Sequence, residues 1–449
     1  MTEPDPAPAE TASPAETASA LAPVPRWELG LVVGLLLALY LPLLGSYTLW
    51  DPWEGHYAEV ARRMLEEEDW LRMRWENENF HSKPPLTFWL MAGFMKVLAV
   101  GEDGGYSGEL VASTRGEWAI RLPFALFGVA GVAFLWYALR RLASRRVAWI
   151  AAAILASSPF YFFIARQAIT DMPSCAFLIG MLAVFLVVAH GDPDKPLPRW
   201  RWGLTHFHVF LLVFLIVVFW QLGYFAWNLR GLRYTIAPKT YVPGWLVMVP
   251  FAAGTLGLTV WAWFRTRTTR QVLMYWFYLM AGLAVLQKGP VAPGLAGLTI
   301  LFYLVLTGDW RLLGKVEIPR GVLIAVAICL PWHFAMFIKD GTPWLNEYLN
   351  QHLLNRALKG VHGDRGTFRY FFGQLGYGMW PWVAFVPVAL ARFAFHGRAR
   401  TAREKTRLLM GIWLICGAGA RRGYTRAASG RPRRRPSART CTRRRLGNR

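Results

Sequence analysis

Long apolar segments separated by short polar loops occupy the chain from residue 26 to residue 420. A membrane-spanning helix needs about 20 mostly apolar residues. Eleven segments meet this requirement, and we expect each to be a span: 27–46, 118–139, 147–166, 172–190, 205–227, 244–264, 271–287, 289–307, 320–338, 373–394 and 406–420. The pattern predicts an all-α, polytopic membrane protein with one membrane domain over residues 26–420.

The segment 86–100 is apolar but short, and it contains Lys96. We expect it to form an interfacial or re-entrant helix, because it cannot span the hydrocarbon at that length. With this assignment, five clusters of Lys and Arg fall on one side, as short cytoplasmic loops do. The clusters are Arg140, Arg141, Arg145 and Arg146; Lys195, Arg199 and Arg201; Arg265, Arg267 and Arg270; Arg311 and Lys315; and Arg398, Arg400, Arg403, Lys405 and Arg407.

The opposite, external side receives the segments 47–117, 228–243 and 339–372 together with Asp171 and the turn 288–290. Within 47–117, apolar residues recur at helical spacing after Trp53 and predict an amphipathic helix lying on the membrane. Its apolar face comprises Tyr57, Val60, Ala61, Met64 and Leu65.

Ionisable residues next to apolar segments on this external side are the candidates for chemistry. Asp51 and Glu54 precede the amphipathic helix, and a carboxylate held there against apolar surface suits a general base for a substrate hydroxyl. Lys83 precedes two prolines, at a depth where a lysine either binds a lipid phosphate or extends to the headgroups. Arg166 and Asp171 lie at the outer mouth of a span.

Composition agrees with a membrane protein, since 55% of residues are hydrophobic and only 17% are charged. Residues 1–25 are rich in Pro, Ala, Thr and Glu, and we expect a disordered cytoplasmic tail. Residues 421–449 contain twelve arginines and no acid. An Arg-rich tail could bind nucleic acid or anionic lipid, but the abrupt change of composition favours an out-of-frame translation that replaces missing C-terminal spans.

Six motifs, in this order and spacing, resemble one family: "DPWEGHYAEVARRM", "FHSKPPLTFW", "IRLPFAL", "ARQAITDMP", "QKGPVAPGL" and "NQHLLNRAL". The family is the bacterial branch of the protein O-mannosyltransferase and aminoarabinose (lipid A) transferase superfamily. The resemblance runs from about Leu29 to Ala394. It implies a GT-C fold in the bacterial inner membrane, an active site facing the periplasm, and a sugar donor carried on polyprenyl phosphate.

The resemblance also implies roles for individual residues. The family's catalytic Asp falls on Trp53, so the base is either Asp51, through a two-residue shift, or Glu54; we favour Asp51. Asp171 matches a second acidic position. The donor phosphate is expected at Lys83, His56, Tyr57 and Lys288, with acceptor or phosphate contacts from Arg166, His352 and Arg356. Ser82 stands where members of the family commonly have a Glu before the lysine that corresponds to Lys83, so the resemblance indicates no metal site. A divalent metal cofactor stays an open alternative.

The expected reaction is an inverting transfer of a sugar to a hydroxyl of lipid A, another lipid, a glycan or a protein. No Gly-rich nucleotide-binding loop occurs, and we expect membrane lipids but no nucleic acid as partners. A lipid or sugar transporter (flippase) and an inactive, truncated remnant of the transferase are the alternatives. Transporters carry ionisable residues near mid-membrane, whereas these acids lie at span ends, which favours an enzyme.

Overall fold

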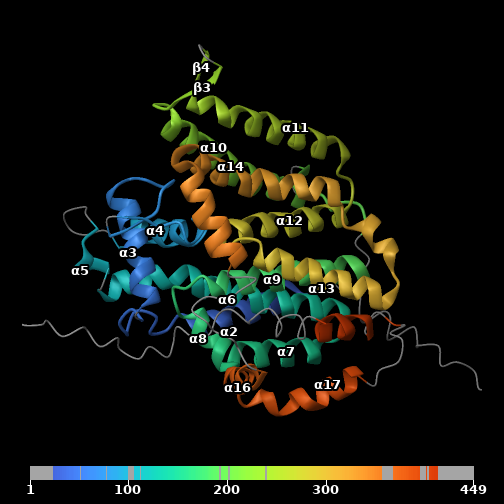
Figure 1. The fold of residues 1–449 in the computed structure, drawn as a ribbon. Coiled ribbons are helices and arrows are strands. Elements are labelled where there is room, and N and C mark those ends of the chain that lie inside the picture. Colours follow the sequence, from blue (N-terminus) through green and yellow to red (C-terminus); the bar gives the residue numbers. More distant parts are fainter. Residues whose placement is uncertain are drawn as a thin grey trace, which may run out of the picture.

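The computed structural model describes residues 24–50, 52–76, 78–99, 106–111, 113–191, 194–200, 203–237, 240–355, 368–394, 401 and 404–412. Most of these residues are helical, and the long helices lie side by side in one bundle (Figure 1). The expected disordered tail, apart from Val24 and Pro25, and the Arg-rich segment 421–449 lie outside the described residues.

Four long helices form the centre of the bundle and pack in the order α6 (Thr114–Leu142), α9 (Asp171–His190), α12 (Thr269–Lys288) and α14 (Ile318–Leu345). Helix α9 is buried around its whole circumference, as an evenly apolar helix should be. Other helices cover this centre: α2 (Arg26–Tyr40), α7 (Arg145–Ser157), α8 (Pro159–Ala165), α10 (His206–Leu229), η2 (Gly244–Met248), α11 (Val249–Arg265), α13 (Val291–Thr307), η3 (Trp310–Lys315), η4 (Asn346–Asn355), α16 (Phe368–Gly378), η5 (Trp382–Phe385) and α17 (Val386–Ala394).

The first external segment contributes α3 (Trp53–Glu66), α4 (Leu86–Leu98) and α5 (Gly108–Val111). Helix α3 buries its apolar side, including Val60 and Met64, within the protein and keeps its charged side partly exposed. The amphipathic pattern is confirmed, but the expectation that the apolar face lies on the membrane is wrong, because this face is buried within the protein and α3 packs against α4. The 13-residue α4 is too short to span a bilayer. Two antiparallel hairpins are the strands of the described chain: β1 (Arg74–Trp75) with β2 (Glu78–Asn79), and β3 (Arg233–Ala237) with β4 (Thr240–Pro243).

Five described helical segments are each long and apolar enough to cross a membrane: Thr114–Leu142, Asp171–His190, His206–Leu229, Gly244–Arg265 and Ile318–Asn350. These spans make the chain an integral membrane protein. Several of the other expected spans are shorter helices, such as α2 with 15 residues and α13 with 17. Within the described residues, the segments that meet this length and composition number five, or six if the bent pair α7 and α8 forms one span, and the expectation of eleven spans stays a prediction.

Two expected spans are broken. The segment 147–166 is divided into α7 and α8, which meet at a bend of 68°. Ser158 has an extended backbone at this break and Pro159 begins α8, because a residue before proline avoids the helical region. The segment 373–394 is divided among α16, η5 and α17, with Pro381 between the first two.

Ion pairs gather the basic loops at one end of the bundle. Arg270 binds Asp194 and Glu317, while Lys405 binds Asp309 and Arg140 binds Glu28. The loops that the sequence assigns to the cytoplasmic side thus meet in space. The opposite end holds the start of α9 and the end of α12, and with them the candidate site residues.

Candidate active site

Glu54 lies in the first turn of α3 and is fully buried beside Arg121 of α6. The two side chains form a two-armed pair, with Nη2 to Oε2 at 2.9 Å and Nε to Oε1 at 3.0 Å. The backbone N–H groups of Trp50 and Ala168 donate to the same carboxylate at 2.8 and 2.7 Å. Four donors therefore occupy both oxygens of the Glu54 carboxylate, the environment of a buried, hydrogen-bonded ion pair.

Arg121 fixes the segment that leads into α3. Besides Glu54, its guanidinium donates to the carbonyls of Leu44, Tyr47 and Thr48 at 2.7–3.0 Å, and it stacks on the Tyr47 ring at 3.9 Å. Asp51, the favoured base, lies outside the described residues. Arg121 is not among the predicted site residues, although an arginine inside an apolar helix is a signal that identifies such a position.

Asp171 and Lys288 are brought together at the same end. Asp171 is the first residue of α9 and Lys288 the last of α12, and Nζ lies 2.8 Å from Oδ1. The Lys288 side chain is only 7% exposed whereas that of Asp171 is 36% exposed, so the carboxylate is the more accessible partner. Gly289 ends α12 with φ 82°, a backbone conformation that favours glycine.

The segment that carries Lys83 lies at the same end of the bundle as the Asp171–Lys288 pair. It is buried, and Pro84 and Pro85 lead directly into α4. Thr87, in the first turn of α4, is hydrogen-bonded to Gln287, which precedes Lys288. The elements that carry Lys83, Asp171 and Lys288 therefore meet at one end of the bundle.

His56 and Tyr57, in α3, lie among aromatic side chains. The His56 imidazole stacks on Trp75 with the centroids 3.6 Å apart, and its Nε2 has no hydrogen-bond partner among the described residues. Burial lowers the pKa of His56, so near pH 7 this side chain offers a neutral hydrogen-bonding atom and no positive charge. Tyr57 is buried and its ring packs edge-on against Phe88.

The expected acceptor contacts are only partly visible. Arg166 follows α8 and donates to the carbonyl of Tyr40 at 3.1 Å, while its own carbonyl accepts from the Tyr47 hydroxyl at 2.7 Å. These bonds tie Arg166 to the Arg121 segment. The side chain of His352, within η4, and the whole of Arg356 lie outside the described residues. Within the described chain, no group of three or more His, Cys, Asp or Glu could hold a metal ion.

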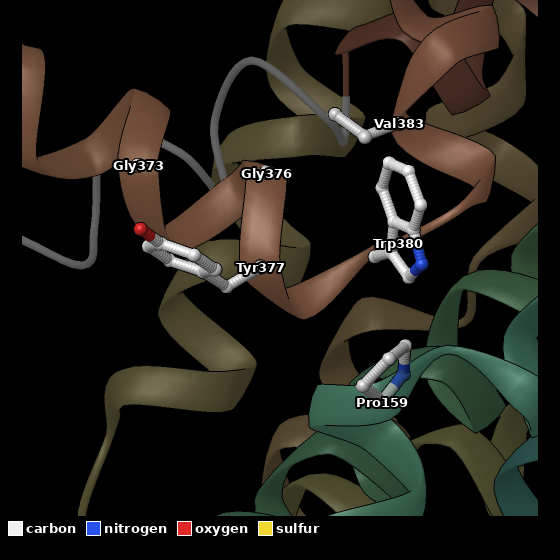
Figure 2. Close-up of a pocket in the computed structure, with 6 residues that line it drawn as sticks. All are labelled: Pro159, Gly373, Gly376, Tyr377, Trp380 and Val383. Atoms are coloured by element: carbon white, nitrogen blue, oxygen red, sulfur yellow. The ribbon is translucent and has the colours of Figure 1, made fainter.

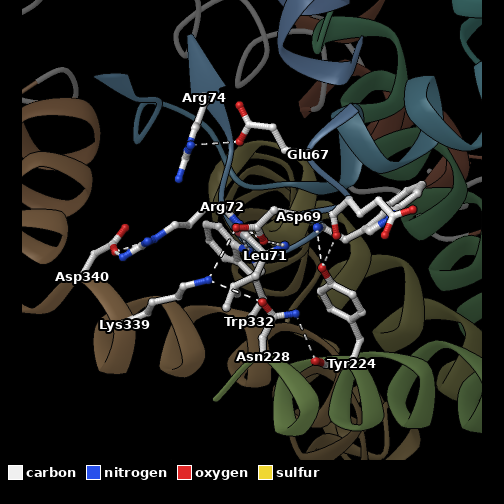
Figure 3. Close-up of polar contacts among 12 residues, drawn as sticks. Glu67, Asp69, Leu71, Arg72, Arg74, Tyr224, Asn228, Trp332, Lys339 and Asp340 are labelled. Atoms are coloured by element: carbon white, nitrogen blue, oxygen red, sulfur yellow. Dashed lines mark hydrogen bonds and ion pairs between the residues drawn. The ribbon is translucent and has the colours of Figure 1, made fainter. Parts of the chain in front are cut away.

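A second polar cluster, absent from the sequence prediction, holds the first external segment against α10 and α14 (Figure 3). The Asp69 carboxylate accepts from the N–H groups of Leu71 and Arg72, and Lys339 lies 3.5 Å from it. Arg72 in turn pairs with Asp340. The partners are 268 residues apart in sequence, so no local pattern identifies them.

Aromatic side chains reinforce the same attachment. The Tyr224 hydroxyl accepts from the N–H of Trp70 at 2.8 Å and donates to the carbonyl of Glu68. The indole of Trp332 donates to the carbonyl of Leu71 at 3.1 Å (Figure 3). The chain that leads from α3 to Lys83 is thereby fixed on both helices.

His81, two residues before Lys83, links this chain to α14 and η4. Its Nδ1 lies 2.8 Å from Glu347 and its Nε2 lies 3.3 Å from Asp340. Burial lowers the pKa of His81, but the hydrogen bonds and charges of the two acids outweigh burial, so the net pKa is raised.

The raised pKa predicts a pH-dependent contribution to stability. A group with a raised folded-state pKa stabilises the fold fully below its unfolded pKa, about 6.5 for histidine, and loses that effect as the pH rises through the folded value. We expect the thermal midpoint of wild type to exceed that of His81→Gln by more at about pH 6 than at about pH 8. A difference that stays constant or grows with pH, measured on detergent-solubilised protein, would contradict this assignment.

A separate cavity of about 600 Å³ lies between α8 and the α16–η5 region (Figure 2). Its lining residues are Pro159, Gly373, Gly376, Tyr377, Trp380 and Val383. None of them is a charged residue or a histidine, so the cavity lacks a general base and a cation for phosphate.

Comparison with known proteins supports the family resemblance. Residues 82–253 match the family described as dolichyl-phosphate-mannose-protein mannosyltransferase. An undecaprenyl phosphate-alpha-4-amino-4-deoxy-L-arabinose arabinosyl transferase of Pseudomonas fluorescens is 23% identical over 87% of this chain and 54% of its own length. A homologue of the same description from Pectobacterium carotovorum is also 23% identical, over 86% of this chain and 52% of its own.

The fold has a solved counterpart. The crystal structure of ArnT from Cupriavidus metallidurans bound to undecaprenyl phosphate superposes with a TM-score of 0.58 at 20% identity, covering 88% of this chain and 56% of that one. The apo structure of the same protein gives a TM-score of 0.53. The expected all-α GT-C fold and the resemblance to the aminoarabinose-transferase branch are confirmed. The chain spans about half the length of the relatives it matches.

Proposed function

We propose that this chain is a membrane glycosyltransferase that moves a sugar from a polyprenyl-phosphate donor to a hydroxyl acceptor on the periplasmic face of the bacterial inner membrane. One observation carries the proposal: in a GT-C bundle Asp171 pairs with Lys288, and the Thr87–Gln287 hydrogen bond attaches the start of α4, which follows Lys83, at the same end. Cations suited to a phosphate and a carboxylate suited to a proton thus lie within one region. The relatives' names supply the donor class, a sugar on undecaprenyl phosphate.

The proposed reaction is a single displacement. A carboxylate removes the proton of the acceptor hydroxyl, whose oxygen attacks the anomeric carbon as the bond from that carbon to the phosphate oxygen breaks. The anomeric configuration inverts, and the departing polyprenyl phosphate takes the electron pair. Lys83 and Lys288 stabilise the charge that develops on it. With Glu54 assigned to structure, Asp51 and Asp171 remain as the candidate bases.

The donor assignment is tested by mass spectrometry of lipids that co-purify with the detergent-extracted chain. We expect wild type to retain a polyprenyl-phosphate sugar and Lys83→Ala to lose it, because Lys83 supplies charge for the phosphate. Lys96→Ala is the matched control, since Lys96 lies exposed on the adjoining α4. The absence of such a lipid from wild type would refute the donor assignment. Equal retention by Lys83→Ala would refute the role of Lys83 in binding the donor phosphate.

The transporter alternative draws on one feature, the bent pair α7 and α8, since transporters often have broken helices at their substrate sites. The break itself consists of Ser157, Ser158 and Pro159 and carries no ionisable side chain. The charged residues lie at helix ends instead, and for this reason we prefer the enzyme.

A further inference from the structure

Gln287 is a fully buried polar residue at the end of α12, directly before Lys288. Its amide nitrogen donates to the carbonyl of Thr170 and to the Thr87 hydroxyl, the latter at 3.3 Å. Its amide oxygen accepts from the Ser174 hydroxyl. One side chain therefore holds three hydrogen bonds to two other elements, and all of them are inside the protein.

The partners of Gln287 are the immediate neighbours of the site residues. Thr170 directly precedes Asp171, and Ser174 lies in the same first turn of α9. Thr87 follows Lys83 by four residues, with the rigid Pro84 and Pro85 between them. Gln287 thus joins the Lys83 segment, the start of α9 and the end of α12.

We propose that Gln287 is a positioning residue that sets the Asp171–Lys288 pair and the Lys83 segment relative to one another, so that one donor phosphate meets both lysines. This inference rests on the proposed function for its chemical meaning. The expected geometric effect does not depend on that function. Without the Gln287 amide, the start of α9 and the end of α12 lose the hydrogen bonds that join them beside the Asp171–Lys288 pair.

Substitution by leucine separates this role from packing. Leucine has a similar volume but leaves the Thr170 carbonyl and two hydroxyls without their buried partner. The first turn of α9 is then free to shift, and a displacement of about 1 Å at a reacting group costs on the order of a hundredfold in rate. We expect kcat/KM for transfer to fall roughly 10- to 100-fold in Gln287→Leu.

Gln221 provides a matched control. It is also fully buried, and its amide nitrogen donates to the carbonyl of Val217 in its own helix and to that of Ile328, which joins α10 to α14. None of these residues lies on the segments that carry Lys83, Asp171 or Lys288. The Gln221 amide oxygen has no hydrogen-bond partner among the described residues, so Gln221→Leu controls for exchanging a buried glutamine that joins two helices, without removing an equal number of hydrogen bonds. A positioning effect should appear only in Gln287→Leu.

Two readouts on the full-length chain test the inference. The first is the rate at which a water-soluble N-hydroxysuccinimide ester acylates Lys288 relative to the exposed Lys96, read by peptide mass spectrometry. The second is kcat/KM for sugar transfer. We expect Lys288 labelling to rise several-fold and transfer to fall in Gln287→Leu, with wild-type values of both in Gln221→Leu.

A double-mutant cycle with Lys288→Met supplies a signature that a purely structural role would not produce. If Gln287 acts through the pair, Gln287→Leu adds little further loss of transfer once Lys288 is gone, so the effects are not additive. Full additivity would overturn the inference, and so would labelling of Lys288 that is unchanged in Gln287→Leu.

The outcomes separate the two claims. If wild type neither retains donor lipid nor transfers sugar, yet Lys288 labelling rises only in Gln287→Leu, the proposed function fails and the positioning of the pair stands. If wild type is active and Gln287→Leu behaves as Gln221→Leu in both readouts, the positioning role fails and the proposed function stands.

Discussion

Glu54→Gln is expected to destabilise the fold by about 3–5 kcal/mol, because it leaves the Arg121 guanidinium buried without its counter-charge. Arg121 and Glu54 are both fully buried, so bulk solvent does not solvate the charge that remains. The amide of glutamine also presents a donor where Arg121, Trp50 and Ala168 need acceptors. Thermal unfolding of the detergent-solubilised protein measures the effect.

Two controls identify the cause. Glu66→Gln removes an exposed carboxylate that pairs with Arg62 at 2.8 Å on the same helix, and such pairs contribute at most about 1 kcal/mol. Glu54→Asp keeps a negative charge beside Arg121 and should therefore be milder than Glu54→Gln. If instead Glu54→Gln kept the wild-type midpoint and lost transfer, Glu54 would be the base and our structural assignment would be wrong.

Asp171→Asn is expected to lower the rate of sugar transfer by a factor of about 10²–10⁴, the usual contribution of a general base. Asparagine has nearly the same shape but cannot accept the proton of the acceptor hydroxyl. Lys288 keeps its positive charge in this variant, so the donor lipid should still co-purify. The experiment compares transfer and lipid retention for wild type, Asp171→Asn and Asp51→Asn.

The comparison of the two aspartates decides which is the base. A loss of transfer with retained lipid in only one variant assigns the base to that residue, and a loss in both indicates that they share the task. If the rate of sugar transfer is unchanged in both variants, the mechanism in which a carboxylate acts as the general base is refuted. Loss of lipid from Asp171→Asn would instead show that Asp171 acts in donor binding.

The helical elements followed well from the sequence because their cause is local. Apolar length predicted α6, α9 and α10, and periodicity predicted α3, with an apolar face that the structure buries. The break at Ser158 was missed because the apolar pattern continues across it, although Pro159 was a visible signal.

The candidate site was harder to predict because its contacts are distant in sequence. Motifs identified Lys83, Asp171 and Lys288, and the structure brings the elements that carry them together. The same motifs also suggested Glu54 as an alternative base. They could not show that its carboxylate accepts hydrogen bonds from Arg121, 67 residues later, and from Ala168, 114 residues later. Gln287 was overlooked since a lone glutamine in an apolar segment has no sequence signal of its own; only its three partners reveal its role.

The buried Glu54 carboxylate also bears on the order in which the protein assembles at the ribosome. Helix α6 enters the bilayer carrying Arg121, whose charge costs about 2.5–3.5 kcal/mol at the centre of an inserted helix and less near its ends. Its counter-charge has been synthesised 67 residues earlier. The fourth donor, Ala168, is made only after α7 and α8, so the hydrogen bonds of the Glu54 carboxylate are completed only after those helices have been synthesised. Nascent chains stalled before residue 168 should therefore expose the first external segment to protease, and longer ones should protect it.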